Sequence, residues 1–162
     1  MSLPFRVEVI RSTRRRKTVS ARLVGDVVRV QVPAWMSKAE ETRYVTHLVQ
    51  RITRQQQRGR IDVMDRAQKL AARFDLLEPA SVRWVSNQRS LWGSCTIDAR
   101  DIRVSDRLVG FPEWVIDYVI VHELAHLSVA SHSKRFWNLV NRYPKAERAR
   151  GFLIAKGLEE DG

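Results

Sequence analysis

The run from Trp114 to Ala130 is apolar almost throughout and contains no glycine or proline, yet the segment HELAH occupies positions 122–126 within it. Such a run predicts a helix buried on nearly all sides, and Pro112 and Glu113 suit its first turn. Polar side chains in a buried helix need partners, because an unsatisfied buried polar group costs free energy. This segment therefore constrains both the fold and the chemistry of the chain.

Helical spacing places the polar residues of this segment in a geometry that suits a metal ion. His122 and His126 lie one turn apart on one face, and Glu123 lies about 100° around the helix from His122. Neutral imidazoles are good zinc ligands, and water in an open coordination position has its pKa lowered to about 7. A neighbouring carboxylate can take a proton from that water. The pattern predicts His122 and His126 as ligands and Glu123 as general base, with zinc preferred over calcium or magnesium.

A third protein ligand has to come from outside this helical face. His132 is the leading candidate, although it lies six residues after His126, so the chain must turn after about Ala130 to bring it back. Glu147 is the competing candidate, in an Arg-rich setting that favours a solvated charge. The fourth histidine, His47, falls in an Arg-rich helical pattern and is predicted to have no functional role.

The segments LWGSC at 91–95, YVIVHELAHL at 118–127 and SHSKRFW at 131–137 resemble the YgjP-like metallopeptidase family, which is distantly similar to SprT-like zincins. RSTRRRK at 11–17 and the sequence after it resemble the amino-terminal part of that family. The resemblance implies a zincin-like catalytic half, zinc on His122, His126 and His132, and Glu123 as the catalytic glutamate, but it leaves the substrate open. A peptide or protein substrate is expected, with a nucleic acid or nucleotide as the alternative. Leu91 stands where an arginine is expected before WGSC, so no anion-binding role is carried over to that position.

The expected fold class is α+β, with a zincin-like catalytic half in which a small antiparallel sheet packs on the HExxH helix, preceded by a basic β-hairpin and an amphipathic helix. Alternating residues predict strands, and apolar residues at helical spacing predict helices. The expected strands cover 7–11, 19–24, 27–32, 82–84, 91–97 and 102–104, and the expected helices cover 37–59, 62–78, 114–130 and 133–142. A short mixed tail follows Pro144.

A chain of 162 residues suits one compact unit with a single core. Within it, residues 1–60 are expected to form a basic amino-terminal segment of β-hairpin and helix. Residues 61–162 are expected to form the zincin-like metal-binding catalytic region.

The net charge of +11 is concentrated in the first of these segments. Residues 1–60 hold 14 Lys+Arg against 4 Asp+Glu, whereas residues 61–162 hold 15 against 14. The adjacent cations Arg14, Arg15, Arg16 and Lys17 are candidate contacts for phosphates of a nucleotide or nucleic acid, or for an acidic partner. The alternative is a solvated basic face in an Arg-rich chain.

Trp92, Gly93 and Ser94 are candidate substrate-binding residues. They are expected on a strand near the metal, where an exposed edge could pair with an extended peptide and Gly93 would permit a close backbone approach. The alternative for Trp92, and also for Cys95, is packing against the HExxH helix. Tyr118 lies about 40° around the helix from His122, so it could support a metal ligand or an oxyanion, but simple packing is favoured.

Three functions follow from these features. The leading hypothesis is a zinc metallopeptidase, and the second is a metal-dependent nucleotide or phosphoester hydrolase that uses the basic amino-terminal segment. The third, a nucleic-acid-binding module with structural zinc, is disfavoured because structural sites usually have four protein ligands.

Composition also bears on membrane association and cellular location. No apolar run is long enough for a membrane span or a secretory signal, so no membrane partner is expected. The single cysteine, Cys95, excludes an internal disulfide, which agrees with a cytoplasmic location. The sequence predicts no particular oligomeric state.

Overall fold

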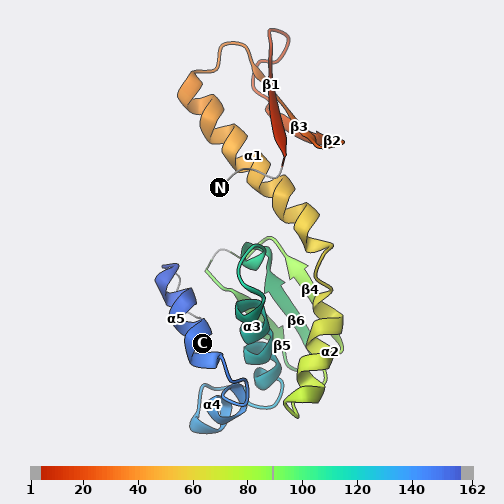
Figure 1. Ribbon diagram of the computed structural model, residues 1–162, viewed down its shortest axis with the longest axis vertical. Coiled ribbons are helices and arrows are strands. Elements are labelled where there is room, and N and C mark those ends of the chain that lie inside the picture. Colours follow the sequence, from red (N-terminus) through yellow and green to blue (C-terminus); the bar gives the residue numbers. More distant parts are fainter. Residues whose placement is uncertain (1–4, 89, 158–162) are drawn as a thin grey trace. The chain divides into compact units, whose positions relative to one another are not determined.

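The computed structural model describes residues 5–88 and 90–157, and it is α+β, as predicted. It divides into two compact units, Met1–Gln57 and Arg58–Gly162 (Figure 1). Each unit has its own cluster of buried hydrophobic residues, whereas the chain length favoured a single core. The reason is that the first long helix buries its apolar face against the small sheet of its own unit.

The first unit contains β1 (Arg6–Ser12), β2 (Ser20–Val24), β3 (Val27–Pro33) and most of α1 (Lys38–Arg58). The strand order is β1-β3-β2, with β3 antiparallel to β2 and parallel to β1. Gly25 and Asp26 connect β2 to β3, and Gly25 adopts a φ of 63°, which glycine tolerates without steric cost. Because β1 and β3 are parallel, their carboxyl ends lie at the same end of the sheet.

One face of this sheet packs against α1. Val28, Val30 and Val32 of β3 are fully buried, because alternate residues of a strand point to the same face. Val45, Leu48, Val49 and Ile52 of α1 belong to the same cluster. The helix begins with a capping box, in which the N–H of Glu40 donates to Ser37 Oγ and the N–H of Ser37 donates to Glu40 Oε2, both at 3.2 Å.

The sheet of the second unit contains β4 (Ser81–Val85), β5 (Gly93–Thr96) and β6 (Asp101–Ser105) in the order β4-β6-β5. The prediction of an antiparallel sheet is wrong, because β6 is antiparallel to β5 but parallel to β4. The connection after β4 carries the chain past β6 to the far edge, and a short turn then returns it as β6. As a result, β5 is an edge strand.

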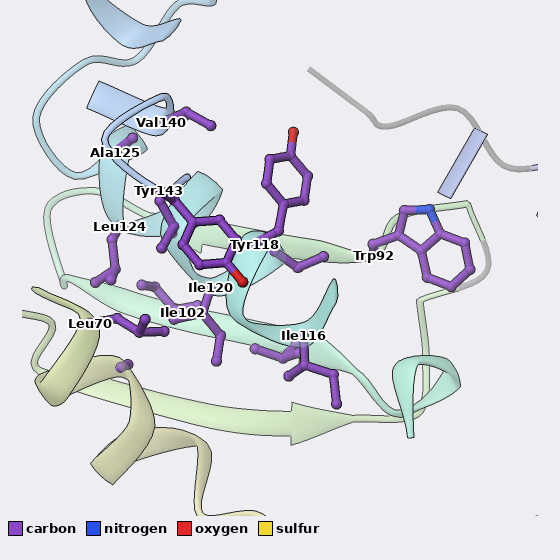
Figure 2. Close-up of a cluster of buried hydrophobic side chains, with 14 of the residues drawn as sticks. Leu70, Trp92, Ile102, Ile116, Tyr118, Ile120, Leu124, Ala125, Val140 and Tyr143 are labelled. Atoms are coloured by element: carbon purple, nitrogen blue, oxygen red, sulfur yellow. The ribbon is translucent and has the colours of Figure 1, made fainter. Parts of the chain in front are cut away.

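The centre of the second unit is α3 (Glu113–His126), which contacts β5 and β6 as well as α2 (Val63–Arg73), α4 (Lys134–Val140) and α5 (Ala146–Ala155). A short 3₁₀ turn, η1 (Asp106–Leu108), precedes α3. Ile116, Ile120 and Leu124 of α3 lie beside Ile102 of β6 and Leu70 of α2 (Figure 2). Neighbours on every side explain why the sequence of α3 is apolar almost all round.

Several helix boundaries differ from those predicted, and α2 ends at Arg73 instead of reaching residue 78. α3 ends at His126 instead of continuing to Ala130, and α5 occupies the segment predicted to be a mixed tail. α5 is rich in arginine, so its pattern is weak, but Ala146, Ala149 and Leu153 are buried against the unit. Among the helices of residues 5–88 and 90–157, none has the combination of length and hydropathy that crossing a membrane requires.

Candidate metal centre

Three histidines lie together at the end of α3. His122 and His126 are one turn apart on the helix and buried, and His132 lies in the connection to α4 and is more exposed. One ligand atom from each histidine lies within 4.8 Å of the others. The two nitrogens His126 Nε2 and His132 Nε2 are 3.0 Å apart. Imidazole nitrogens grouped in this way can hold a transition metal ion.

The early end of α3 brings His132 back to the helix. The N–H of Leu127 donates to Leu124 O at 3.1 Å, which tightens the last turn. Ser133 then caps α4, with its Oγ accepting from the N–H of Phe136 at 3.4 Å. The five residues between His126 and His132 thus form a compact reversal rather than a further helical turn.

Phe136 of α4 supports all three imidazoles from one side. Its ring stacks on His126 at a centroid distance of 4.4 Å and lies 4.7 Å from His132 and 4.9 Å from His122. Trp137 lies 5.6 Å from His132, and the guanidinium of Arg150 covers its ring at 4.2 Å. Sequence reasoning missed this support, although the FW pair four and five residues after His132 was visible.

The second ring nitrogen of His126 fixes its orientation. Nδ1 lies 3.1 Å from Val129 O, a contact in which Nδ1–H donates, so the lone pair is left on Nε2. Burial, followed by the proximity of His122, lowers the pKa of His126 to about 4. His126 is therefore neutral near pH 7, the state in which an imidazole binds a metal.

Glu123 is 5% exposed, and its side chain lies against the edge strand. A Cβ built on Gly93 would lie 3.1 Å from Glu123 Cγ, 3.1 Å from Glu123 Oε1 and 3.0 Å from Val119 Cγ1. Such contacts are tighter than nine in ten real Cβ contacts, so a side chain at residue 93 would require α3 or Glu123 to shift by a few tenths of an ångström. Glycine here thus leaves the space that the Glu123 carboxylate occupies.

A cleft of about 260 Å³ opens between β5 and the end of α3. Its described lining combines strand residues, helix residues and the reversal after α3, namely Leu91, Gly93, Ser94, Cys95, Ile97, Glu123, His126 and Ala130. Burial, followed by the charge of Glu123, raises the pKa of the Cys95 thiol to about 11. Cys95 is therefore a neutral thiol in the cleft wall at pH 7, which makes it a poor metal ligand.

The predicted substrate-binding residues have different environments. Ser94 lines the cleft, and its Oγ accepts from Gln88 Nε2 at 2.6 Å and from Arg103 Nε at 2.9 Å. Trp92 is 4% exposed and packs against Phe111 at a centroid distance of 5.5 Å. Trp92 thus lies in the core, whereas Gly93 and Ser94 face the cleft.

None of the other candidates from the sequence belongs to the metal-binding group found among the described residues. Glu147 is exposed on α5 and His47 is exposed on α1. Tyr118 is fully buried, with its ring centroid 6.1 Å from that of His122. Arg14, Arg15, Arg16 and Lys17 lie in the first unit, after β1.

Three grouped imidazoles beside a buried glutamate and an open cleft are an arrangement typical of metal-dependent hydrolases. The chain belongs to the YgjP-like family, whose metallopeptidase-domain model matches residues 38–153.

Two solved structures share the fold. The metallopeptidase zymogen abylysin of Pyrococcus abyssi is 20% identical with a TM-score of 0.55, and the match covers 62% of this chain and 100% of that one. The metallopeptidase zymogen jannalysin of Methanocaldococcus jannaschii is 19% identical with a TM-score of 0.51, and the match covers 60% and 99%. Comparison with curated proteins finds no significant match.

Proposed function

We propose that this protein is a zinc-dependent metallopeptidase in which His122, His126 and His132 hold the metal and Glu123 acts as general base. The observation that carries the proposal is the grouping of three imidazoles, with ligand atoms within 4.8 Å of one another, beside a buried glutamate that lines an open cleft. A hydrolytic centre needs this combination of ligands, base and access.

The donor set fits zinc better than calcium or magnesium. Three nitrogen donors suit a borderline-soft ion, and the hydrogen bond from His126 Nδ1 to Val129 O is the outer-shell contact typical of zinc-binding histidines. When bound there, zinc would supply a Lewis acid that polarises a peptide carbonyl and makes a water molecule more acidic. Glu147 is less suitable as a third ligand, because it is exposed on α5, outside the cluster.

Glu123 is proposed to move protons without binding the metal. Its carboxylate takes a proton from the attacking water and returns it to the nitrogen of the leaving amine. Its position next to Gly93 restricts the side chain, and a restricted base loses little conformational freedom in reaching the reactive geometry.

The edge strand β5 is proposed to bind the substrate. An extended peptide can add to an exposed sheet edge through main-chain hydrogen bonds, and here Gly93 and Ser94 would supply them beside Glu123. Leu91, Ile97 and Ala130 give the cleft wall apolar patches that suit an uncharged substrate side chain. Trp92 would support this strand from the core rather than contact the substrate.

The cleft favours a peptide over a phosphoester substrate. The carboxylate of Glu123 lines the cleft and would repel a phosphate. The described residues that line the cleft include no lysine or arginine to offset the charge of that phosphate. The cations Arg14 to Lys17 belong to the other unit. The third hypothesis, structural zinc in a nucleic-acid-binding module, is less well supported because His126 lines an open cleft together with Glu123.

The test compares Glu123→Gln with the matched control Glu147→Gln in zinc-loaded protein on a fluorogenic casein substrate. Glu123→Gln keeps the size of the side chain but removes the base, so hydrolysis should fall by about 10²- to 10⁴-fold with zinc content unchanged. Glu147→Gln should retain near-parental activity.

Near-parental casein hydrolysis by Glu123→Gln would refute the proposed base. Loss of zinc together with activity would show instead that Glu123 is a ligand. If the parent hydrolyses nucleotides but not casein, and Glu123→Gln abolishes that hydrolysis, the phosphoester hypothesis replaces the peptidase one.

A further inference from the structure

Trp35 is the most exposed large hydrophobic residue that the structure describes, at 65% exposure. It lies between β3 and α1 in the first unit, and its indole N–H donates to the backbone oxygen of Arg16 at 2.9 Å. That oxygen belongs to the run of cations Arg14 to Lys17 after β1. The exposed indole of Trp35 is therefore hydrogen-bonded to the backbone of the Arg14 to Lys17 segment.

Several interactions hold this indole in place. The N–H of Ala34 donates to Ser12 O at 3.0 Å, and the Arg11 guanidinium donates to Ala34 O at 3.0 Å and to Met36 O at 2.8 Å. The same guanidinium pairs with Glu41 of α1 at 2.5 Å. The backbone on both sides of Trp35 is thus anchored to β1, so the ring is displayed to solvent on a fixed support.

The cations beside Trp35 are themselves accessible. Arg14, Arg16 and Lys17 are exposed, and Arg15 is half-buried, with its guanidinium donating to Thr18 Oγ1 at 3.1 Å and to Gln31 Oε1. Val30 and Val32 are buried against α1, so Gln31, which lies between them on β3, points to the opposite face of the sheet. The hydrogen bond to Gln31 therefore holds Arg15 at this outer face.

The same outer face of the sheet is basic. It carries exposed Arg6, Arg22 and Arg29, of which Arg29 pairs with Glu8 at 3.0 Å. Residues 1–57 hold 12 Lys+Arg against 4 Asp+Glu, so most of the net charge of the protein lies in this unit. The ligand that complements such a surface is a polyanion with planar groups.

We infer that the first unit binds single-stranded nucleic acid, with a base stacked on Trp35 and phosphates on Arg14, Arg16 and Lys17. A fixed aromatic ring beside a cationic groove or loop is the combination that binds single strands with little sequence preference. A duplex keeps its bases stacked on one another, and an acidic peptide lacks bases to stack, so both use the cations alone. The inference is independent of the proposed metallopeptidase activity.

The test is a fluorescence-anisotropy titration of the full-length protein with a labelled 20-nucleotide oligothymidylate at several salt concentrations. Trp35→Ala should weaken binding by about 5- to 100-fold, and Trp35→Phe should recover part of the loss, because base–aromatic stacking depends on a ring at this position. Replacing Arg14, Arg16 and Lys17 together with alanine should lower the log–log salt slope by about 2.

The matched control replaces three exposed cations elsewhere, Arg43, Arg51 and Lys145, with alanine and should bind nearly as the parent does. Thermal melting checks that each variant is folded. Equal loss in both triple variants would overturn the inference, since binding would then be diffuse. An unchanged affinity in Trp35→Ala, a duplex bound as tightly as the single strand, or full competition by polyglutamate at equal charge would overturn it as well.

Discussion

At the scale of single residues, Gly93 lies where an added side chain would crowd α3 and the proposed base. An alanine Cβ there would press on Val119 and Glu123 at 3.0–3.1 Å. We expect Gly93→Ala to lower the free energy of unfolding by about 1–3 kcal/mol, as overpacking of a core does. We also expect hydrolytic activity to fall by about 10²-fold, because a small displacement of a catalytic group is costly. Urea denaturation and the casein assay measure the two effects.

Gly151 of α5 offers a matched control. A Cβ on Gly151 meets nothing within 4 Å, and the residue lies inside a helix, so Gly151→Ala should raise stability by about 0.5–1 kcal/mol. Its activity should equal that of the parent. A Gly93→Ala variant that is as stable and active as Gly151→Ala would show that Glu123 does not need this space.

The sequence predicted the candidate metal ligands, but it did not predict the side chains and backbone groups that hold those ligands in place. Imidazoles at helical spacing and a nearby glutamate are local signals, so His122, His126 and Glu123 stood out in a buried helix. The contacts of Phe136 with the imidazoles and of His126 Nδ1 with Val129 O depend on how the chain reverses after α3. Such reversals leave no periodic signal.

At the scale of elements, α2 and α3 are joined by Arg66. Its guanidinium pairs with Asp117, which is 17% exposed, and with Glu113 at 3.2 Å. The hydrogen bonds to Asp117 raise the pKa of Arg66 further above its already high value. Arg66→Ala leaves a nearly buried carboxylate unpaired, so the free energy of unfolding should fall by about 1–3 kcal/mol in denaturant titrations.

The pair between Lys69 and Asp65 on α2 is the control for this prediction. Both side chains are more than half exposed, and an exposed i,i+4 pair contributes only about 0.3–0.5 kcal/mol. Lys69→Ala should therefore change stability little. If both variants lose the same small amount, the contact between Arg66 and Asp117 does not hold α2 to α3.

The pattern of the elements was easier to predict than their pairing. The structure confirms three local features, namely the capping box at Ser37, Asp62 as the cap of α2, and the apolar run of α3. The Asp62 carboxylate accepts from the N–H of Asp65 at 3.0 Å. The parallel pairing of β4 with β6 joins strands that are not adjacent in sequence. Local patterns do not encode such pairings, because they depend on the path of the connection.

At the scale of the whole molecule, the two hydrophobic clusters predict that metal removal acts on one unit only. Zinc that binds the folded state stabilises the unit that holds it. Chelation should therefore speed amide hydrogen exchange in α3 and α4, and leave exchange in β3 and α1 unchanged. Equal acceleration in both units would contradict separate cores.

The central claim is that His122, His126 and His132 form one zinc site, and metal analysis of His132→Ala tests it most directly. The parent should hold about one zinc per chain, and loss of His132 should lower affinity by more than the roughly 10- to 100-fold that loss of an outer-shell partner costs. His47→Ala, which removes an exposed histidine on α1, should retain the zinc. Full occupancy in His132→Ala, measured in the presence of a competing chelator, would contradict the account and make Glu147 the leading third ligand.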